Sequence, residues 1–164
     1  MEELLKKISQ YQLFNFLLSG AVLVTLLSKT TSINLINDDV IAAFFTFYIV
    51  GLVISRIGSI IIEPSLKKLG VIKFVAYQEY LDAVKADPKI DTLSQENNTY
   101  RTLIATFLIF IIIFALDKHA ASFMSGKSNL IIYALSSAIL LLFVLAYHKQ
   151  TSYITKRVKN SKEK

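Results

Sequence analysis

The chain has 164 residues, 54% of them apolar, a net charge of +6 and no cysteine. Soluble domains contain about 45–50% apolar residues even when glycine is counted, so this composition, with a mean hydropathy of +0.52, excludes an ordinary soluble domain. The absence of cysteine excludes disulfides and thiolate metal sites.

Four long apolar stretches dominate the sequence: Tyr11–Leu27, Val40–Ile62, Thr102–Leu116 and Ile131–Tyr147. The hydrocarbon core of a bilayer is about 30 Å thick, and about 20 helical residues cross it. The second and fourth stretches approach that length, and tyrosine or lysine side chains at the ends of the other two lengthen them by reaching into the interface. The sequence therefore predicts an all-α polytopic membrane protein with four transmembrane helices.

The basic residues predict the orientation. Fourteen lysines and arginines lie before the first stretch, between the second and third, or after the fourth, whereas the two opposite segments hold three. Because basic loops stay in the cytoplasm, both termini and the segment between the second and third stretches are predicted to be cytoplasmic. The predicted parts are an N-terminal transmembrane hairpin (1–62), a cytoplasmic helical insert (63–101), a C-terminal transmembrane hairpin (102–148) and a basic tail (149–164). The tail would suit anionic lipid headgroups or a polyanionic ligand.

The insert between the two hairpins has its own helix signals. Pro64 suits the first turn of a short basic helix, Pro64–Leu69, and Gly70 would end it. Apolar residues at helical spacing then predict a second, amphipathic helix. These residues are Ile72, Val75, Tyr80, Leu81 and Val84.

Asp87-Pro88 would end this second helix, because the residue before a proline avoids the helical region. We expect Asp91, Thr92 or Ser94 to cap a third helix. This third helix is predicted to continue straight into the third apolar stretch.

Arg56 lies within the second apolar stretch, where a charged side chain is costly. It is about 24 Å along the helix from Val40, so its side chain can snorkel to the cytoplasmic headgroups. The alternatives are that Arg56 lines a pore or pairs with Glu63, which lies on the same helix face. Arg56 and Glu63 are therefore the candidate pore or gating residues.

Small residues form a stripe on the same stretch. Gly51, Ser55 and Ser59 repeat at four-residue spacing, with Gly58 beside them. Such a stripe lets helices approach closely, within one subunit or between subunits. We interpret these four residues as a helix-packing surface, in preference to a site with a catalytic serine.

Other polar residues also lie inside the predicted spans: Asn15, Ser19 and Thr25 in the first, and Ser136 and Ser137 in the fourth. Interhelical hydrogen bonds, worth about 0.6–2 kcal/mol each, would explain them. A pore wall also needs a few polar groups, and the sequence leaves both interpretations open.

Amide, aromatic and basic side chains gather at the predicted inner interface. The candidate ligand-binding residues are Lys67, Lys68, Asn97, Asn98, Tyr100 and Arg101. A tyrosine ring, amides and an arginine fork can stack on a base and hold a phosphate. The alternative is a helix entry within an aromatic and basic membrane belt, in which Tyr11 and Tyr147 lie at the same level.

Enzyme chemistry has little support in the sequence. His119 is predicted in an outer loop and His148 at the inner end of the fourth stretch, so they cannot share a site. No histidine or cysteine cluster has metal-ligand spacing, and there is no glycine-rich phosphate loop. We therefore expect no catalytic residue, no metal site and no cofactor.

Three runs between residues 50 and 102 carry a family resemblance: SRIGSIIIEP at 55–64, LKK at 66–68, and the pattern D-x-K-I…L-S-x-x-N-N-x-Y-R-T at 87–102. They are similar to small four-span proteins of bacterial antiphage-defence loci, such as the membrane effector of Hailong-type systems or the membrane component of Kiwa. The Hailong resemblance implies a tetrameric ion channel of the bacterial inner membrane. It also implies control by an oligonucleotide signal, which a nucleotidyltransferase encoded nearby makes and which the basic and amide groups facing the cytoplasm bind.

The leading functional hypothesis is a homo-oligomeric channel or membrane-disrupting effector that a cytoplasmic ligand gates, because one four-helix subunit has little room for an aqueous path. The alternative is a membrane scaffold or sensor that tethers a cytoplasmic partner protein. A membrane-embedded enzyme ranks last.

Overall fold

The computed structural model of the chain describes residues 2–36, 38–120 and 126–161, and this part of the chain is all-α, with no strand. Its elements are α1 (Glu2–Thr30), α2 (Val40–Ile57), the π-helix η1 (Gly58–Ile62), α3 (Glu63–Lys68), α4 (Tyr77–Ala86), α5 (Lys89–Ala120) and α6 (Gly126–Ser161).

Four helical segments are long and apolar enough to cross a membrane: Tyr11–Thr30, Val40–Lys68, Lys89–Lys118 and Asn129–Ser161. This confirms the four apolar helices predicted from the sequence and suggests a membrane location. In the most apolar windows of the second and fourth segments, 11% of the residues are buried, against 44% in the third. The helix α5 is therefore the centre of the molecule, whereas α2 and α6 present wide apolar faces to the surroundings.

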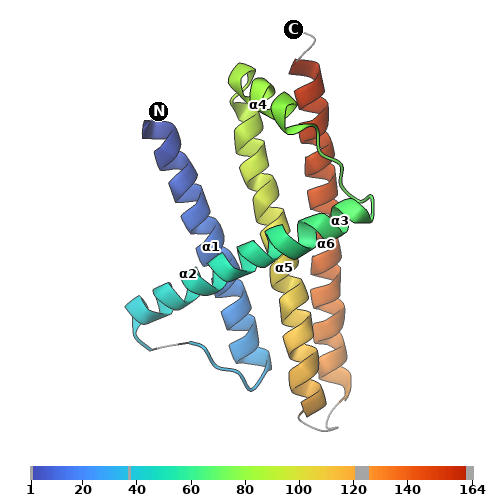
Figure 1. The fold of residues 1–164 in the computed structure, drawn as a ribbon. Helices are drawn as coiled ribbons and strands as arrows, with labels where there is room; N and C mark the ends of the chain where they lie inside the picture. The colour runs from blue at the N-terminus through green and yellow to red at the C-terminus, as the bar shows by residue number, and fades with distance from the viewer. Residues whose placement is uncertain (1, 37, 121–125, 162–164) are drawn as a thin grey trace.

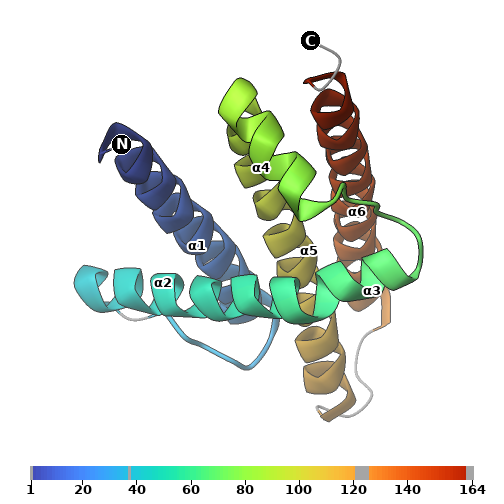
Figure 2. The ribbon, with the colours of Figure 1, turned by 45° about the horizontal axis from the view of Figure 1, so that its top comes forward.

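The helices α1, α5 and α6 run along the length of the molecule, while the continuous rod of α2, η1 and α3 crosses them (Figures 1 and 2). The rod passes over α1 and α5 and ends with α3 on the side of α6. The helix α4 lies at the end that also holds the start of α5 and the end of α6 (Figure 1). We call this the α4 end.

Gly20 and Gly51 mark the crossing of α1 and α2. A Cβ atom on Gly20 would lie 1.8 Å from the carbonyl oxygen of Phe47, and one on Gly51 would lie 1.8 Å from the carbonyl oxygen of Phe16. The two backbones can touch here because neither glycine has a side chain. The crossing therefore requires glycine at both positions.

The main core lies where α5 packs against its neighbours. Phe110 and Phe114 of α5 stack with their ring centroids 5.7 Å apart, and Phe114 meets Tyr133 of α6 edge to face at 4.9 Å. Leu23 and Leu27 of α1 belong to the same buried cluster. This cluster joins the helices that run lengthwise.

Polar side chains line the seam between α1 and α5. The Tyr11 hydroxyl donates to the carbonyl oxygen of Gln95 at 2.6 Å, and the Asn15 amide donates to the Thr102 hydroxyl at 3.3 Å. Ser19 is buried and donates to the carbonyl oxygen of Asn15 in its own helix. Within this chain, Asn15 therefore contributes to helix packing. Of the other polar residues in the predicted spans, Ser136 is buried, and Thr25 and Ser137 are exposed.

The π-helix η1 lies directly before Pro64. In a regular α-helix the ring of Pro64 would clash with the carbonyl group of Ile60, and proline has no N–H to donate to it. The wider turn of η1 accommodates this, because the N–H of Glu63 bonds to the carbonyl oxygen of Gly58, five residues earlier. The helical rod can therefore continue past Pro64.

The predicted helix Pro64–Leu69 is confirmed as α3, and Gly70 follows it with a φ of +71°. The prediction of a second helix starting near Ile72 is wrong at its N-terminal end, because α4 begins at Tyr77. Residues 71–76 are instead held as a non-helical loop.

Hydrogen bonds hold the first half of the loop. The Val71 N–H bonds back to the carbonyl oxygen of Leu66 at 3.0 Å, and the Thr155 hydroxyl of α6 donates to the carbonyl oxygen of Lys73 at 3.1 Å. These bonds replace the ones that a helix over the same residues would make.

The helix α4 ends at Ala86, as Asp87-Pro88 predicts, and α5 continues into the third apolar stretch. The expectation that Asp91, Thr92 or Ser94 caps α5 is wrong. The helix begins at Lys89, whose N–H is bound by the Asp87 carboxylate at 3.2 Å. This earlier carboxylate takes the capping role because Pro88 suits the start of a helix.

Candidate functional site: a polar pocket at the α4 end

A pocket of about 350 Å³ lies at the α4 end, between α3, the loop 69–76, α4, α5 and α6. Four residues predicted as ligand-binding or gating residues line it: Glu63, Lys67, Asn97 and Asn98. The folding of the insert against α5 and α6 therefore brings these groups, which are far apart in the sequence, to one place.

Glu63 is at the centre of a charged network beside the pocket. Its Oε1 atom is 2.8 Å from Lys67 Nζ, and its Oε2 atom accepts a hydrogen bond of 2.5 Å from Arg101 Nη1. The side chains of Glu63 and Arg101 are 20% and 14% exposed, so water screens this pair only partly. The network therefore ties α3 to α5.

Lys67 is the accessible cation of this pocket. Its side chain is 48% exposed, and its Nζ atom lies 4.6 Å from the centre of the Phe74 ring. Lys68, the next residue, is exposed and does not line this pocket. The structure thus separates the positions of two lysines that the sequence alone cannot distinguish.

The two adjacent asparagines have different surroundings. Asn97 is 3% exposed and donates from its amide to the Thr151 hydroxyl of α6 at 3.1 Å, so it holds α5 against α6. Asn98 is exposed and its amide is accessible from the pocket. Tyr100 packs against Phe143 with ring centroids 6.4 Å apart and does not line the pocket.

The remaining predicted site residues lie on the rod. Arg56 is exposed on α2, and within one chain it does not pair with Glu63, whose partners are Lys67 and Arg101. Seven residues of regular α-helix would put Arg56 and Glu63 on one face, but η1 lies between them and turns Glu63 toward α5.

The predicted packing stripe lies along the same rod. A Cβ atom on Gly58 would meet the Arg101 carbonyl oxygen at 3.3 Å, so η1 and α5 are close at this point. Ser55 and Ser59 are half-buried, and Gly51 contacts α1 at the crossing with α2.

Sequence reasoning missed the aromatic wall of the pocket, which consists of Phe74, Tyr77 and Tyr80. Tyr80 is half-buried, and burial raises the pKa of its hydroxyl. Tyr77 is 75% exposed. Tyr77 and Tyr80 lie three residues apart on one side of α4, and this spacing was the available signal. Phe74 comes from the loop before α4, where no local pattern indicates its position.

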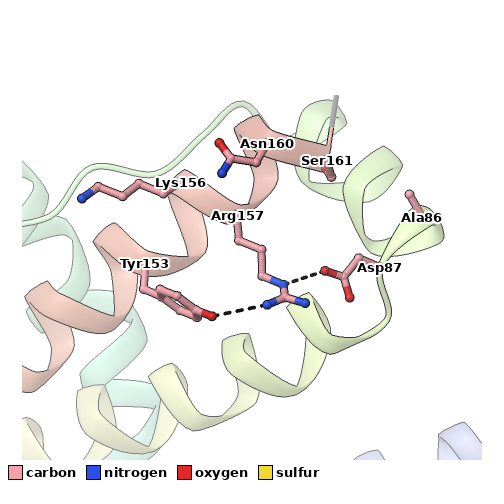
Figure 3. Close-up of a pocket in the computed structure, with 7 residues that line it drawn as sticks. All are labelled: Ala86, Asp87, Tyr153, Lys156, Arg157, Asn160 and Ser161. Carbon is pink, nitrogen blue, oxygen red and sulfur yellow. Dashed lines mark hydrogen bonds and ion pairs between the residues drawn. The ribbon is translucent and has the colours of Figure 1, made fainter. Parts of the chain in front are cut away.

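A second, larger pocket of about 710 Å³ lies between the end of α6 and the α4–α5 junction (Figure 3). Arg157 Nε donates to Asp87 Oδ2 at 2.6 Å, and Arg157 Nη1 donates to the Tyr153 hydroxyl at 3.3 Å. The Arg157 guanidinium holds the pKa of the Asp87 carboxyl below its usual value. This ion pair fastens the end of α4 to α6.

Among the described residues, no group of histidine and carboxylate side chains could hold a metal ion. His148 is exposed, and its Nδ1 atom is hydrogen-bonded to the carbonyl oxygen of Val71. His119 lies in α5, outside the residues whose side chains are described.

Comparison of the chain with protein-family models, curated proteins and solved structures finds no match.

Proposed function

We propose that this chain is a subunit of a homo-oligomeric membrane channel, or of a membrane-disrupting effector, that opens when a cytoplasmic ligand binds in the pocket beside Glu63. The observation that carries this proposal is the network of Glu63, Lys67 and Arg101. Glu63 and Lys67 of this network line the pocket and also belong to α3, the last part of the apolar rod.

The chemistry of the pocket favours an anionic ligand with a planar group. Lys67 supplies an accessible positive charge, Asn98 an amide, and Tyr77 an exposed ring on which a planar group can stack. A nucleotide or oligonucleotide, which the family resemblance implies, has both an anionic and a planar part. A nucleotidyltransferase encoded next to this chain would be the source of such a signal.

Binding can act on the membrane part through charge competition. Lys67 and Glu63 both belong to α3, so the attachment of α3 to α5 depends on the Glu63–Arg101 pair. A ligand phosphate that binds at Lys67 and also competes with Glu63 for the Arg101 guanidinium would weaken this attachment. Since α3 continues through η1 into α2, a shift of α3 would move the apolar rod. The ligand shifts a closed–open equilibrium only if it prefers the open arrangement.

An aqueous path would form between subunits. The apolar faces of α2 and α6 provide surfaces on which copies of the chain can pack in the bilayer. A tetramer is the assembly that the family resemblance implies. The defence role and the location in a bacterial inner membrane, with both termini in the cytoplasm, belong to the same proposal.

The test is ion flux from liposomes that contain the purified protein, with short DNA and RNA oligonucleotides and mononucleotides as probes. We expect flux only with an active probe. Lys67→Ala should raise the probe concentration needed for half-maximal flux at least tenfold. Lys68→Ala is the matched control, because it removes the same charge one residue away from a side chain that does not line the pocket, and it should leave this concentration unchanged.

Two outcomes would contradict the proposal. Equal effects of the two lysine substitutions would remove the pocket as the ligand site. Liposomes that stay impermeant with every probe, while the purified oligomer captures a defined cytoplasmic protein, would favour the scaffold or sensor function instead.

A further inference from the structure

A third pocket, of about 300 Å³, lies between α6 and the first half of the loop 69–76. Its α6 side consists of His148, Ser152 and Thr155, whose spacing places them on one face of the helix. Its other side consists of residues 70–73. We call it the His148 pocket. The ligand pocket beside Glu63 shares Thr155 alone with it.

The His148 pocket lies at the end of the fourth apolar stretch. His148 directly follows Tyr147, the last residue of that stretch, and α6 continues through both residues without a break. Ser152 and Thr155 lie about one and two turns further along the helix. With α6 in a membrane, as its length and composition suggest, the pocket is therefore at the level of the lipid headgroups.

The face of α6 that carries His148 is apolar on the bilayer side of the pocket. Leu145 and Leu141 lie three and seven residues before His148, and the side chain of each is 59% exposed. On the other side of the pocket, Leu69 directly precedes the lining residues 70–73 and is also exposed. Apolar surface for an acyl chain and polar groups for a headgroup thus follow each other along one helix face.

The polar groups of the His148 pocket favour a negatively charged headgroup. Lys73 is exposed and supplies a positive charge, and Ser152 supplies a hydroxyl group. Ammonium and hydroxyl groups are suitable donors to the oxygen atoms of a phosphate. Of the described residues that line the pocket, none carries a carboxylate that would repel an anion.

Hydrogen bonds to α6 hold the loop in place at the His148 pocket. The Thr155 hydroxyl donates to the carbonyl oxygen of Lys73 at 3.1 Å, and His148 Nδ1 donates to the carbonyl oxygen of Val71. Ile72, between these two loop residues, is 2% exposed and belongs to the main core. The backbone of Lys73 is therefore fixed beside α6 before any ligand binds.

We propose that the His148 pocket binds the headgroup of an anionic phospholipid, and that an acyl chain of the same lipid lies along Leu141 and Leu145. A free phosphate ion could use the same polar groups, but only a lipid would also cover the apolar face next to them. Basic pockets on the cytoplasmic side of membrane proteins bind such headgroups. The neighbouring exposed residues of α6, Leu135 and Leu142, remain available for contact with another copy of the chain.

The natural absence of tryptophan allows a direct measurement. Leu145→Trp places a single fluorescent indole about one turn from His148, on the face proposed to hold the acyl chain. The full chain is reconstituted in phosphatidylcholine vesicles that contain a small fraction of either brominated phosphatidylglycerol or brominated phosphatidylcholine, because bromine quenches the fluorescence on contact. We expect the anionic lipid to be preferred about fivefold at this position.

Further variants make the test specific, each in the Leu145→Trp chain. Lys73→Ala should remove most of the preference and Lys73→Arg should keep it. Lys149→Ala is the matched control, because it removes an exposed charge next to His148 but outside the pocket, and it should leave the preference unchanged. In a separate chain, Ile131→Trp, at an exposed position near the other end of α6, should show no preference.

Three outcomes would overturn the lipid site. One is equal quenching of Leu145→Trp by the two brominated lipids. Equal losses in Lys73→Ala and Lys149→Ala would show only a general attraction of anionic lipids to basic segments. Loss of the preference on addition of inorganic phosphate, at an ionic strength kept constant, would assign the pocket to a soluble anion instead.

The lipid site and the channel can fail separately, because quenching is measured without ion flux. Vesicles that stay impermeant with every probe, but in which the preference is found, would refute the channel and leave the lipid site standing. A permeable chain without the preference would do the reverse.

Discussion

Glu63 and Arg101 are 38 residues apart in the chain, yet the Glu63 carboxylate accepts a 2.5 Å hydrogen bond from the Arg101 guanidinium. Their pair joins the end of the apolar rod to the helix at the centre of the molecule. Because both side chains are mostly shielded from water, neither charge can lose its partner cheaply.

Replacing Glu63 with glutamine should therefore destabilise the protein. Glu63→Gln leaves the Arg101 guanidinium without a counter-charge, and we expect a loss of about 1–3 kcal/mol in the free energy of unfolding. Denaturant titration in detergent micelles measures this loss. The control is Asp82→Asn, which removes a carboxylate that is 57% exposed and 3.8 Å from Lys85 and should cost less than about 0.5 kcal/mol. Similar losses in both variants would contradict a shielded pair at Glu63.

At the crossing of α1 and α2, the addition of a single methyl group should markedly lower the stability of the protein. Gly51→Ala and Gly20→Ala each place a Cβ atom 1.8 Å from a carbonyl oxygen, so the helices must separate. We expect losses of about 1–3 kcal/mol or more, seen as a lower melting temperature in detergent. Gly58→Ala is the control, because its nearest contact is 3.3 Å and the gain in helix propensity, about 1 kcal/mol, offsets the crowding. Equal losses of melting temperature in Gly51→Ala and Gly58→Ala would contradict the close approach of α1 and α2 at Gly51.

Asn97 and Thr151 should be energetically coupled. A double-mutant cycle with Asn97→Ala and Thr151→Val isolates the hydrogen bond between them from the effect of each substitution alone. We expect a coupling of about 0.5–1.5 kcal/mol in the free energy of unfolding, as for other bonds between helices. Additive effects of the two substitutions would show that the bond contributes nothing.

Acid should weaken the attachment of α4 to α6. The pKa of Asp87 is lower in the folded chain than its usual value of 3.8, chiefly because Arg157 donates a hydrogen bond to it. The stabilisation from this pair is therefore complete above the ordinary aspartate pKa and is lost as the pH falls through the lower pKa of the folded state. The melting temperature of the protein in detergent should therefore fall as the pH drops below about 4.

Asp87→Asn provides the control for this acid effect. It has no carboxylate to protonate at this position, so its melting temperature should be lower than that of the unchanged protein at neutral pH, and this difference should disappear as the pH falls to about 3. A transition of the same size in Asp87→Asn would assign the acid effect to another group.

Local sequence patterns predicted the helices but not their arrangement. Length and hydropathy are sufficient to identify four apolar helices, because exposure to lipid depends on the composition of each stretch by itself. Pro64, Gly70 and Asp87-Pro88 likewise act on the neighbouring backbone. The start of α3 and the C-terminal ends of α3 and α4 could therefore be predicted. The crossing of α2 over α5 depends on contacts between segments far apart in the chain, and no local pattern contains it.

The same difference between local patterns and long-range packing explains which features of the candidate site could be predicted. Lys67, Asn97 and Asn98 could be proposed from their chemistry, but only packing decides that Asn97 is buried against Thr151 while Asn98 is accessible. The partner of Glu63 was open for a similar reason. The seven-residue spacing made Arg56 one possible partner, because a regular helix would place both residues on one face, and the structure gives Arg101 that place.

The five residues of η1 change the direction in which the following side chains leave the helix, because a π-turn holds one residue more than an α-turn. Removing one residue between Gly58 and Ile62 would turn everything that follows by about 100°. Glu63 and Lys67 would then point away from Arg101, although neither had been substituted. A one-residue deletion in η1 should therefore abolish the proposed ligand sensitivity as completely as destroying the pocket itself.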